Sequence, residues 1–330
     1  MQRFFLLLLG LMILCGSAPH AAGAIEDDFE QEFEELPQRK RPSLWHRPAK
    51  DSPAEQLAYA EKLRSEGAAR KALRQYRALV HKWHDAPEAV TAQFRYAALL
   101  DERERYRQAF DEYQYLVDNA AQNFDYEDVL ERQFRIANHI RTVRHGRLPG
   151  LRGFATPERA LPLFEQIVAN APNWDRAAEC QFFIGLIHEG EESYDLAAAA
   201  YEKVQLRYRD SDFAPTAAFR RADCLRRIAD KYPRDEESTK RALSALSGFI
   251  LDYPASPDAE RARQQRDALK ERLAEMCFER AVFYDRTAGR PESAVIAYTD
   301  FLSKFPTSHR KAEAEARLSA LKKEVENEEK

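Results

Sequence analysis

Two histidines in the stretch HKWH, His81 and His84, have the spacing in this sequence that best suits a metal ion. Residues three apart lie on one face of a helix, so both imidazoles could reach the same cation. No third histidine accompanies them, and the pair flanks Trp83. We therefore favour a surface pair beside a packed tryptophan, and expect no metal and no cofactor.

Other residue patterns that could carry catalysis are also weak. The sequence contains no glycine-rich phosphate loop, no nucleophile elbow and no zinc-protease helix motif. Acidic residues are abundant, but those such as Asp101, Glu102 and Glu104 have the pattern of exposed helix charges. The sequence therefore predicts a protein that is not an enzyme and has no small-molecule substrate.

The composition favours a helical protein that does not bind nucleic acid. Among 330 residues only 11 are glycine, whereas Ala, Leu, Glu and Arg are abundant, which favours helix over sheet. The formal net charge is −4, so no basic surplus attracts a polyanion. Cys180, Cys224 and Cys277 match no zinc spacing and fall in apolar helical stretches, where cysteine usually packs as a small hydrophobe.

A short motif recurs along the chain: a phenylalanine, two variable residues and a small residue. It reads QFRYA at 93–97, QFRIA at 133–137 and QFFIG at 181–185, with looser copies at 218–222 and 277–281. Each unit then supplies a second alanine and, four residues later, a large side chain. Two helices approach closely only where one facing side chain is small, so each unit predicts a helix pair. The small residues are Ala60, Ala97, Ala137, Gly185, Ala222 and Ala281, and the large ones Tyr76, Tyr113, Phe164, Tyr201, Leu246 and Tyr298.

Six such units predict an all-α fold that resembles the tetratricopeptide repeat: a superhelical solenoid of about six helix pairs with a C-terminal capping helix. The resemblance covers residues 54–307, with insertions at about 142–157 and 255–273. The period from Ala60 to Ala97 is 37 residues, close to the 34 of that family. One pair cannot bury its apolar face alone, so neighbours must stack. Residues 308–330 are polar and are expected to form the capping helix and tail.

In this repeat family, certain positions of the first helix tend to face a concave groove. Apolar rungs separated by charges at such positions suit an extended peptide. The alternative is that each phenylalanine is half-buried between neighbouring pairs and spaces them; the sequence leaves both open. The candidates are Phe94, Phe134, Phe182, Phe219 and Phe278, with Arg141, Arg226 and Arg227 among the nearby polar residues.

The first insertion is rich in arginine. Arg141, Arg144, Arg147 and Arg152 line it, and its acidic residue, Glu158, lies at its end. This charge would suit an anionic lipid or an acidic partner, and it equally suits an ordinary solvated loop.

The N-terminus has the pattern of an export signal, predicted at residues 1–24. Arg3 precedes an apolar run at residues 4–14, and a tract of small residues ends in a candidate cleavage site at 22–24. Cys15 is an alternative site of lipid attachment, although Leu14 stands where a lipoprotein signal usually has a small residue. An acidic, proline-containing linker follows at residues 25–53, which predicts either a solvated tether or a partner-docking segment.

The last repeats carry a narrower resemblance. Within residues 242–308, the run Leu273-Ala274-Glu275, the pair Phe283-Tyr284 and the FP that ends a helix are similar to the closing repeats of the BamD family. The resemblance implies a lipid-anchored, non-enzymatic scaffold of β-barrel assembly in the periplasm, at the inner face of the outer membrane. In that family the last repeats hold periplasmic domains of the barrel-forming partner, and the early repeats meet unfolded outer-membrane proteins. A general periplasmic adaptor of the Tol–Pal type is the alternative.

Overall fold

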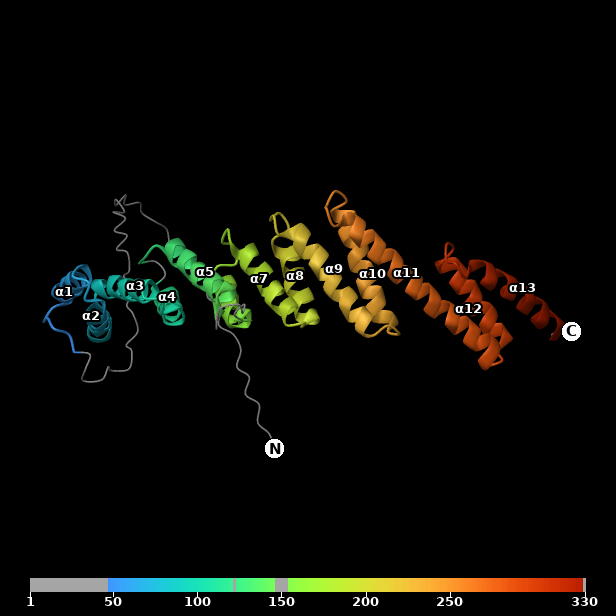
Figure 1. Ribbon diagram of the computed structural model, residues 1–330, viewed down its shortest axis with the longest axis horizontal. Coiled ribbons are helices and arrows are strands. Elements are labelled where there is room, and N and C mark those ends of the chain that lie inside the picture. Colours follow the sequence, from blue (N-terminus) through green and yellow to red (C-terminus); the bar gives the residue numbers. More distant parts are fainter. Residues whose placement is uncertain (1–46, 121–122, 146–153, 329–330) are drawn as a thin grey trace, which may run out of the picture. The chain divides into compact units, whose positions relative to one another are not determined.

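The computed structural model describes residues 47–120, 123–145 and 154–328. Helices make up most of these ranges (Figure 1), and none of those helices combines the length and the apolar character needed to cross a membrane. The α-helices are α1 Pro53–Ser65, α2 Ala69–Lys82, α3 Pro87–Glu102, α4 Tyr106–Asn119, α5 Tyr126–Thr142, α6 Leu161–Asn170, α7 Ala177–Gly190, α8 Tyr194–Arg207, α9 Ala214–Lys231, α10 Glu236–Asp252, α11 Ala259–Val282, α12 Pro291–Lys304 and α13 Lys311–Glu328.

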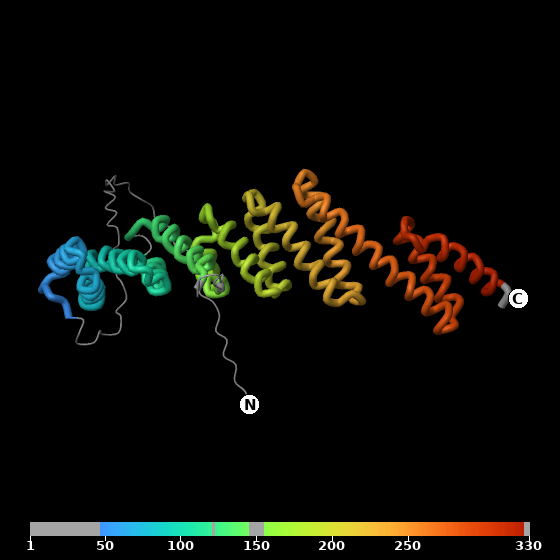
Figure 2. The backbone as a smooth tube through the Cα atoms, in the orientation of Figure 1, coloured from blue at the N-terminus to red at the C-terminus, as the bar shows by residue number. Residues whose placement is uncertain are grey.

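The helices pair in chain order, from α1 with α2 to α11 with α12, and α13 packs on α12. The second helix of each pair also packs on the first helix of the next, as α8 does on α9 and α10 on α11. Figure 2 shows the same succession along the backbone. The prediction of an all-α tetratricopeptide-type solenoid of about six pairs with a C-terminal capping helix is therefore confirmed.

Each pair closes around its predicted small residue. The five alanines among these residues are fully buried, and so are their large partners on the second helices. The closest approach is in the fourth pair, where a Cβ added to Gly185 would lie 2.4 Å from Cε1 of Tyr201. No other residue fits that position without displacing the tyrosine ring.

The glutamine of the motif also has a structural role. Gln56, Gln93 and Gln181 are buried four residues before the small residue of their pairs. Each side-chain amide donates a hydrogen bond of 3.0–3.1 Å to a main-chain carbonyl oxygen of the second helix. A buried amide requires such a partner, so this glutamine links the two helices of a pair.

The two insertions take different forms. Residues 143–160 separate α5 from α6 and include two short antiparallel strands, β1 Arg144–His145 and β2 Phe154–Ala155, and a 3₁₀ turn, η2 Pro157–Ala160. The second insertion runs into α11, a continuous helix that leads into a π-helical turn, η3 Phe283–Thr287. The connection after α5 therefore interrupts a pair, whereas the second insertion lengthens a helix.

The three cysteines of the repeat region are free and buried, as predicted. Burial raises the pKa of the Cys224 thiol to about 12. A thiol with so high a pKa is not a reactive nucleophile at neutral pH. These cysteines therefore contribute packing.

Candidate functional site

The motif phenylalanines lie inside the stack. Phe134, Phe182, Phe219 and Phe278 are only 4–7% exposed, and Phe94 is half-buried. Each ring lies against an aromatic ring of the second helix of its own pair, with centroid distances of 5.3–6.2 Å. They occupy packing positions, the alternative that the sequence left open.

A residue at or just before the start of the next helix, or within its first turns, lies against each of these rings. Four are covered by an arginine guanidinium and one by a second phenylalanine ring. The contacts are Arg132 over Phe94 at 5.2 Å, Arg176 over Phe134 at 4.5 Å, Phe213 against Phe182 at 5.3 Å, Arg261 over Phe219 at 5.3 Å and Arg310 over Phe278 at 5.1 Å. These rings do not form the exposed apolar rungs that a phenylalanine-lined groove requires.

Arg141 is engaged within the third and fourth pairs. Its guanidinium stacks 4.0 Å from the ring centroid of Phe183 and donates a hydrogen bond of 2.7 Å to Oδ1 of Asn138. Burial lowers the pKa of Arg141. The side chain therefore joins α5 to α7 and is not a free ligand for a partner.

Arg226 and Arg227 both bind the buried carboxylate of Asp223. Their guanidinium groups donate hydrogen bonds of 2.8 Å to its two oxygens. Burial alone would raise the pKa of Asp223, but these two hydrogen bonds hold it below its ordinary value. Arg227 also lies over the ring of Tyr194, 5.3 Å from its centroid. Both arginines thus act as internal clamps.

Several other predictions fall outside the residues that the structure describes. These are the signal at 1–24 with Cys15, most of the linker, and Arg147 and Arg152 of the first insertion. Within the described ranges, no group of three or more His, Cys, Asp or Glu side chains could hold a metal ion.

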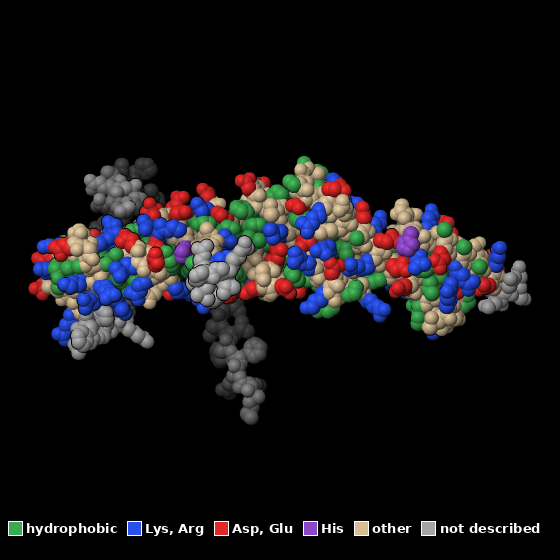
Figure 3. Space-filling view, viewed as in Figure 1, with side chains coloured by type: hydrophobic (Ala, Val, Ile, Leu, Met, Phe, Trp, Pro, Cys, Tyr) green, Lys and Arg blue, Asp and Glu red, His purple; other side chains and the backbone are tan. Residues whose placement is uncertain are grey.

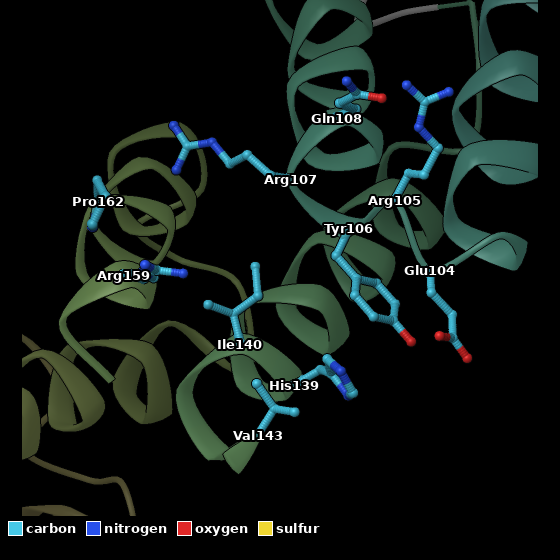
Figure 4. A pocket seen from close by; sticks show the side chains of 10 residues that line it. All are labelled: Glu104, Arg105, Tyr106, Arg107, Gln108, His139, Ile140, Val143, Arg159 and Pro162. Atoms are coloured by element: carbon cyan, nitrogen blue, oxygen red, sulfur yellow. The ribbon is translucent and has the colours of Figure 1, made fainter. Parts of the chain in front are cut away.

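A groove of about 910 Å³ lies where the second helix pair meets the third (Figure 4), and we call it the edge groove. Its walls come from the start of α4, the end of α5, and the segment of η2 and early α6. Tyr106 and His139 lie against each other on one side of it, with ring centroids 4.3 Å apart. Ile140, Val143 and Pro162 supply apolar lining. Sequence reasoning did not identify this site.

The equivalent junction between the fourth and fifth pairs shows why the edge groove is open. There Tyr194, Ile228 and Lys231 occupy the places of Tyr106, Ile140 and Val143, but the cavity measures only about 290 Å³. Residues 232–235 turn the chain directly from α9 into α10, whereas residues 143–160 intervene between α5 and α6. The two junctions therefore differ in the length of the connection that follows the first helix of the next pair.

The charges around the edge groove are unevenly distributed. Neither Arg105 nor Arg159 forms an ion pair within the described part of the chain, and Arg107 pairs only with Asp111, 3.3 Å away on the surface of α4. Figure 4 shows Arg107 and Arg159 on the side of Ile140, and Glu104 beyond Tyr106. Partial burial raises the pKa of Tyr106, and the nearby carboxylates of Glu104 and Asp101 raise it further. Elsewhere basic and acidic side chains are interspersed over the face in Figure 3.

The comparisons with known proteins bear mainly on the last repeats. Residues 218–329 match the family model YfiO, described as an outer membrane lipoprotein, and this range runs from α9 into α13. A comparison with curated protein sequences gives no match.

Solved structures with some similarity are tetratricopeptide-repeat proteins. One is titled "Crystal structure of YrrB: a TPR protein with an unusual peptide-binding site"; it is 18% identical, with 64% of this chain and 92% of that chain covered and a TM-score of 0.30. Another, a tetratricopeptide repeat protein from Parabacteroides merdae, is 12% identical, with 82% and 98% covered and a TM-score of 0.28. By its own helix pairs, this chain has a tetratricopeptide-type fold, and by the family match its C-terminal repeats resemble the BamD-like outer-membrane lipoproteins.

Proposed function

We propose that this protein is a non-enzymatic scaffold of outer-membrane β-barrel assembly, located in the periplasm at the inner face of the outer membrane. The observation that carries the proposal is the match of residues 218–329 to an outer membrane lipoprotein family. The matched range comprises the fifth and sixth helix pairs and α13. By that resemblance, these repeats hold periplasmic domains of a barrel-forming partner.

Exposed apolar side chains on the second helices support a protein partner. Leu206 and Leu251 are 75% and 80% exposed. Each lies five residues after the large core residue of its pair, Tyr201 or Leu246, so the repeat places them on corresponding faces of α8 and α10. A partner that covers these faces would remove both leucines from water.

Attachment to the membrane is proposed to occur through lipid on Cys15 or through the partner. Fatty-acid labelling of the full chain and of Cys15→Ala separates the two. Labelling that Cys15→Ala abolishes establishes a lipid anchor; an unlabelled chain that is cleaved near Ala24 requires a partner for membrane association.

Co-purification tests the scaffold function. The chain, recovered from envelope extracts, is expected to bring a β-barrel assembly component, and Leu251→Glu is expected to reduce that yield. Asp118→Glu is the matched control, because Asp118 has the same position in the second pair, outside the family match. Recovery of Tol–Pal or peptidoglycan-associated proteins alone would refute the assembly role and favour a general periplasmic adaptor.

A further inference from the structure

The edge groove presents positive charge that the described part of the chain leaves largely unpaired. Arg159 has no ion pair among the described residues, and the Arg107–Asp111 pair leaves both side chains more than half exposed. An exposed pair of this kind contributes little free energy, so Arg107 can exchange its partner at low cost. The two guanidinium groups lie on the same side of the groove in Figure 4.

Apolar side chains also line the edge groove, beside these arginines. Ile140 and Val143 are half-buried at the end of α5, and Pro162 borders them from α6. At the end of α9 the chain turns directly into α10, whereas the described elements that follow α5 and pack on it are η2 and α6. A ligand complementary to this surface therefore offers an apolar group next to acidic ones.

We infer that the edge groove binds an extended segment of a partner protein in which carboxylates lie next to a large apolar side chain. The carboxylates meet Arg107 and Arg159, and the apolar side chain covers Ile140 and Val143. Arginine suits this contact because its planar fork binds a carboxylate through two parallel hydrogen bonds. The inference rests on the proposed scaffold function and gives the chemistry of one of its partners.

A protein segment fits the groove better than an anionic membrane surface does. A flat layer of headgroups could reach the exposed arginine side chains, but Ile140 is half-buried and lines a groove together with residues of α4 and η2. An extended chain can contact both the arginines and Ile140, because its side chains project individually. Binding to vesicles of anionic phospholipid is therefore an outcome against the inference.

Fluorescence anisotropy with the full chain tests the inference. The probe is a labelled peptide GSEEFEELGS, blocked at both ends so that no terminal charge contributes, and the comparison peptide is GSQQFQQLGS. We expect the acidic peptide to bind, and the double variant Arg107→Ala/Arg159→Ala to bind it about tenfold more weakly, as expected for two solvent-exposed charge contacts. The matched control is Lys231→Ala/Arg234→Ala, which removes the same charge near the equivalent junction. Far-UV circular dichroism establishes that all variants are folded.

Three outcomes would overturn the inference: equal binding of the glutamine peptide, equal weakening by the two double variants, or binding to anionic vesicles without binding of the peptide. Its failure is distinguishable from failure of the scaffold function. Peptide binding by a chain that recovers no assembly component would leave the groove valid and reject the scaffold role. Recovery of an assembly component by a chain that does not bind the peptide would reject the groove and leave the scaffold role valid.

Discussion

The second–third and fourth–fifth junctions begin with the same turn and end with different surfaces. Glu104 and Glu192 both adopt left-handed backbone, with φ of 57° and 58°, at the end of a first helix. The next main-chain N–H then bonds back to a carbonyl of that helix at 2.9 Å in both places. Tyr106 and Tyr194 begin the second helices in equivalent positions. The turns are therefore alike.

What differs is the helix that packs against each turn. At the fourth–fifth junction Arg227 is held by Asp223 and covers Tyr194. At the second–third junction His139 takes the place of Arg227, and Arg135 the place of Asp223. The second–third junction thus lacks both members of this clamp. It also lacks the tight turn that joins α9 to α10 at the other junction. We attribute the larger groove to the absence of the Asp–Arg clamp and of the tight turn in the third pair.

The largest effect is expected from the packing of the pairs that lead into the two junctions. Ala97 faces Tyr113 in the second pair, but Gly185 faces Tyr201 in the fourth. Gly185→Ala is expected to lower the free energy of unfolding by about 2 kcal/mol, because the new methyl group collides with a buried ring. Urea denaturation measures this, with Gly190→Ala as the control, since a Cβ there meets nothing within 4 Å. Equal stability of the two variants would show that the pairs are packed alike.

A charge exchange sharpens the comparison of the two surfaces. Asp195 occupies at the fourth–fifth junction the place that Arg107 has at the edge groove. Arg107→Asp is expected to weaken binding of the acidic peptide about tenfold, because a like charge replaces an opposite one. Asp195→Arg is expected to confer no binding, since Arg227 still covers Tyr194 there. Gain of peptide binding in Asp195→Arg would mean that an arginine at this position is sufficient for binding without the apolar lining of the edge groove.

The sequence predicted the helix pairs well because their rule is local. Small and large residues recur at helical spacing, so the fold class and the number of pairs followed from the pattern. The orientation of the Phe94 side chain could not be predicted from the repeat pattern, because Arg132, which covers its ring, belongs to the next pair. The edge groove was harder still, since it depends on a long connection and on the absence of an acid at position 135. Residue spacing predicts contacts that form, but it does not predict that the clamp is missing at one junction.

Acid should weaken the clamp that distinguishes the fourth–fifth junction from the second–third junction. The folded-state pKa of Asp223 lies below its ordinary value of 3.8, so the ionised carboxylate stabilises the fold at higher pH. That stabilisation is present above pH 3.8 and is lost as the pH falls through the lower, folded-state pKa. Asp223→Asn is expected to cost about 1 kcal/mol at neutral pH, because charged hydrogen bonds become neutral ones. Unfolding free energies of wild type and variant should converge in acid; a constant difference would contradict the clamp.

The smallest effect concerns the turn that the junctions share. Left-handed backbone carries a Cβ penalty that glycine avoids, so Glu104→Gly and Glu192→Gly should each raise the free energy of unfolding by about 0.5 kcal/mol after the greater freedom of the unfolded chain is subtracted. Glu191 has a negative φ of −86°, so glycine relieves no backbone strain there. Glu191→Gly is therefore the control that should lower the free energy of unfolding. Urea denaturation compares the three. Equal gains at 104 and 192 place the difference between the junctions in the following helix, whereas a loss at 104 alone would place it in the turn itself.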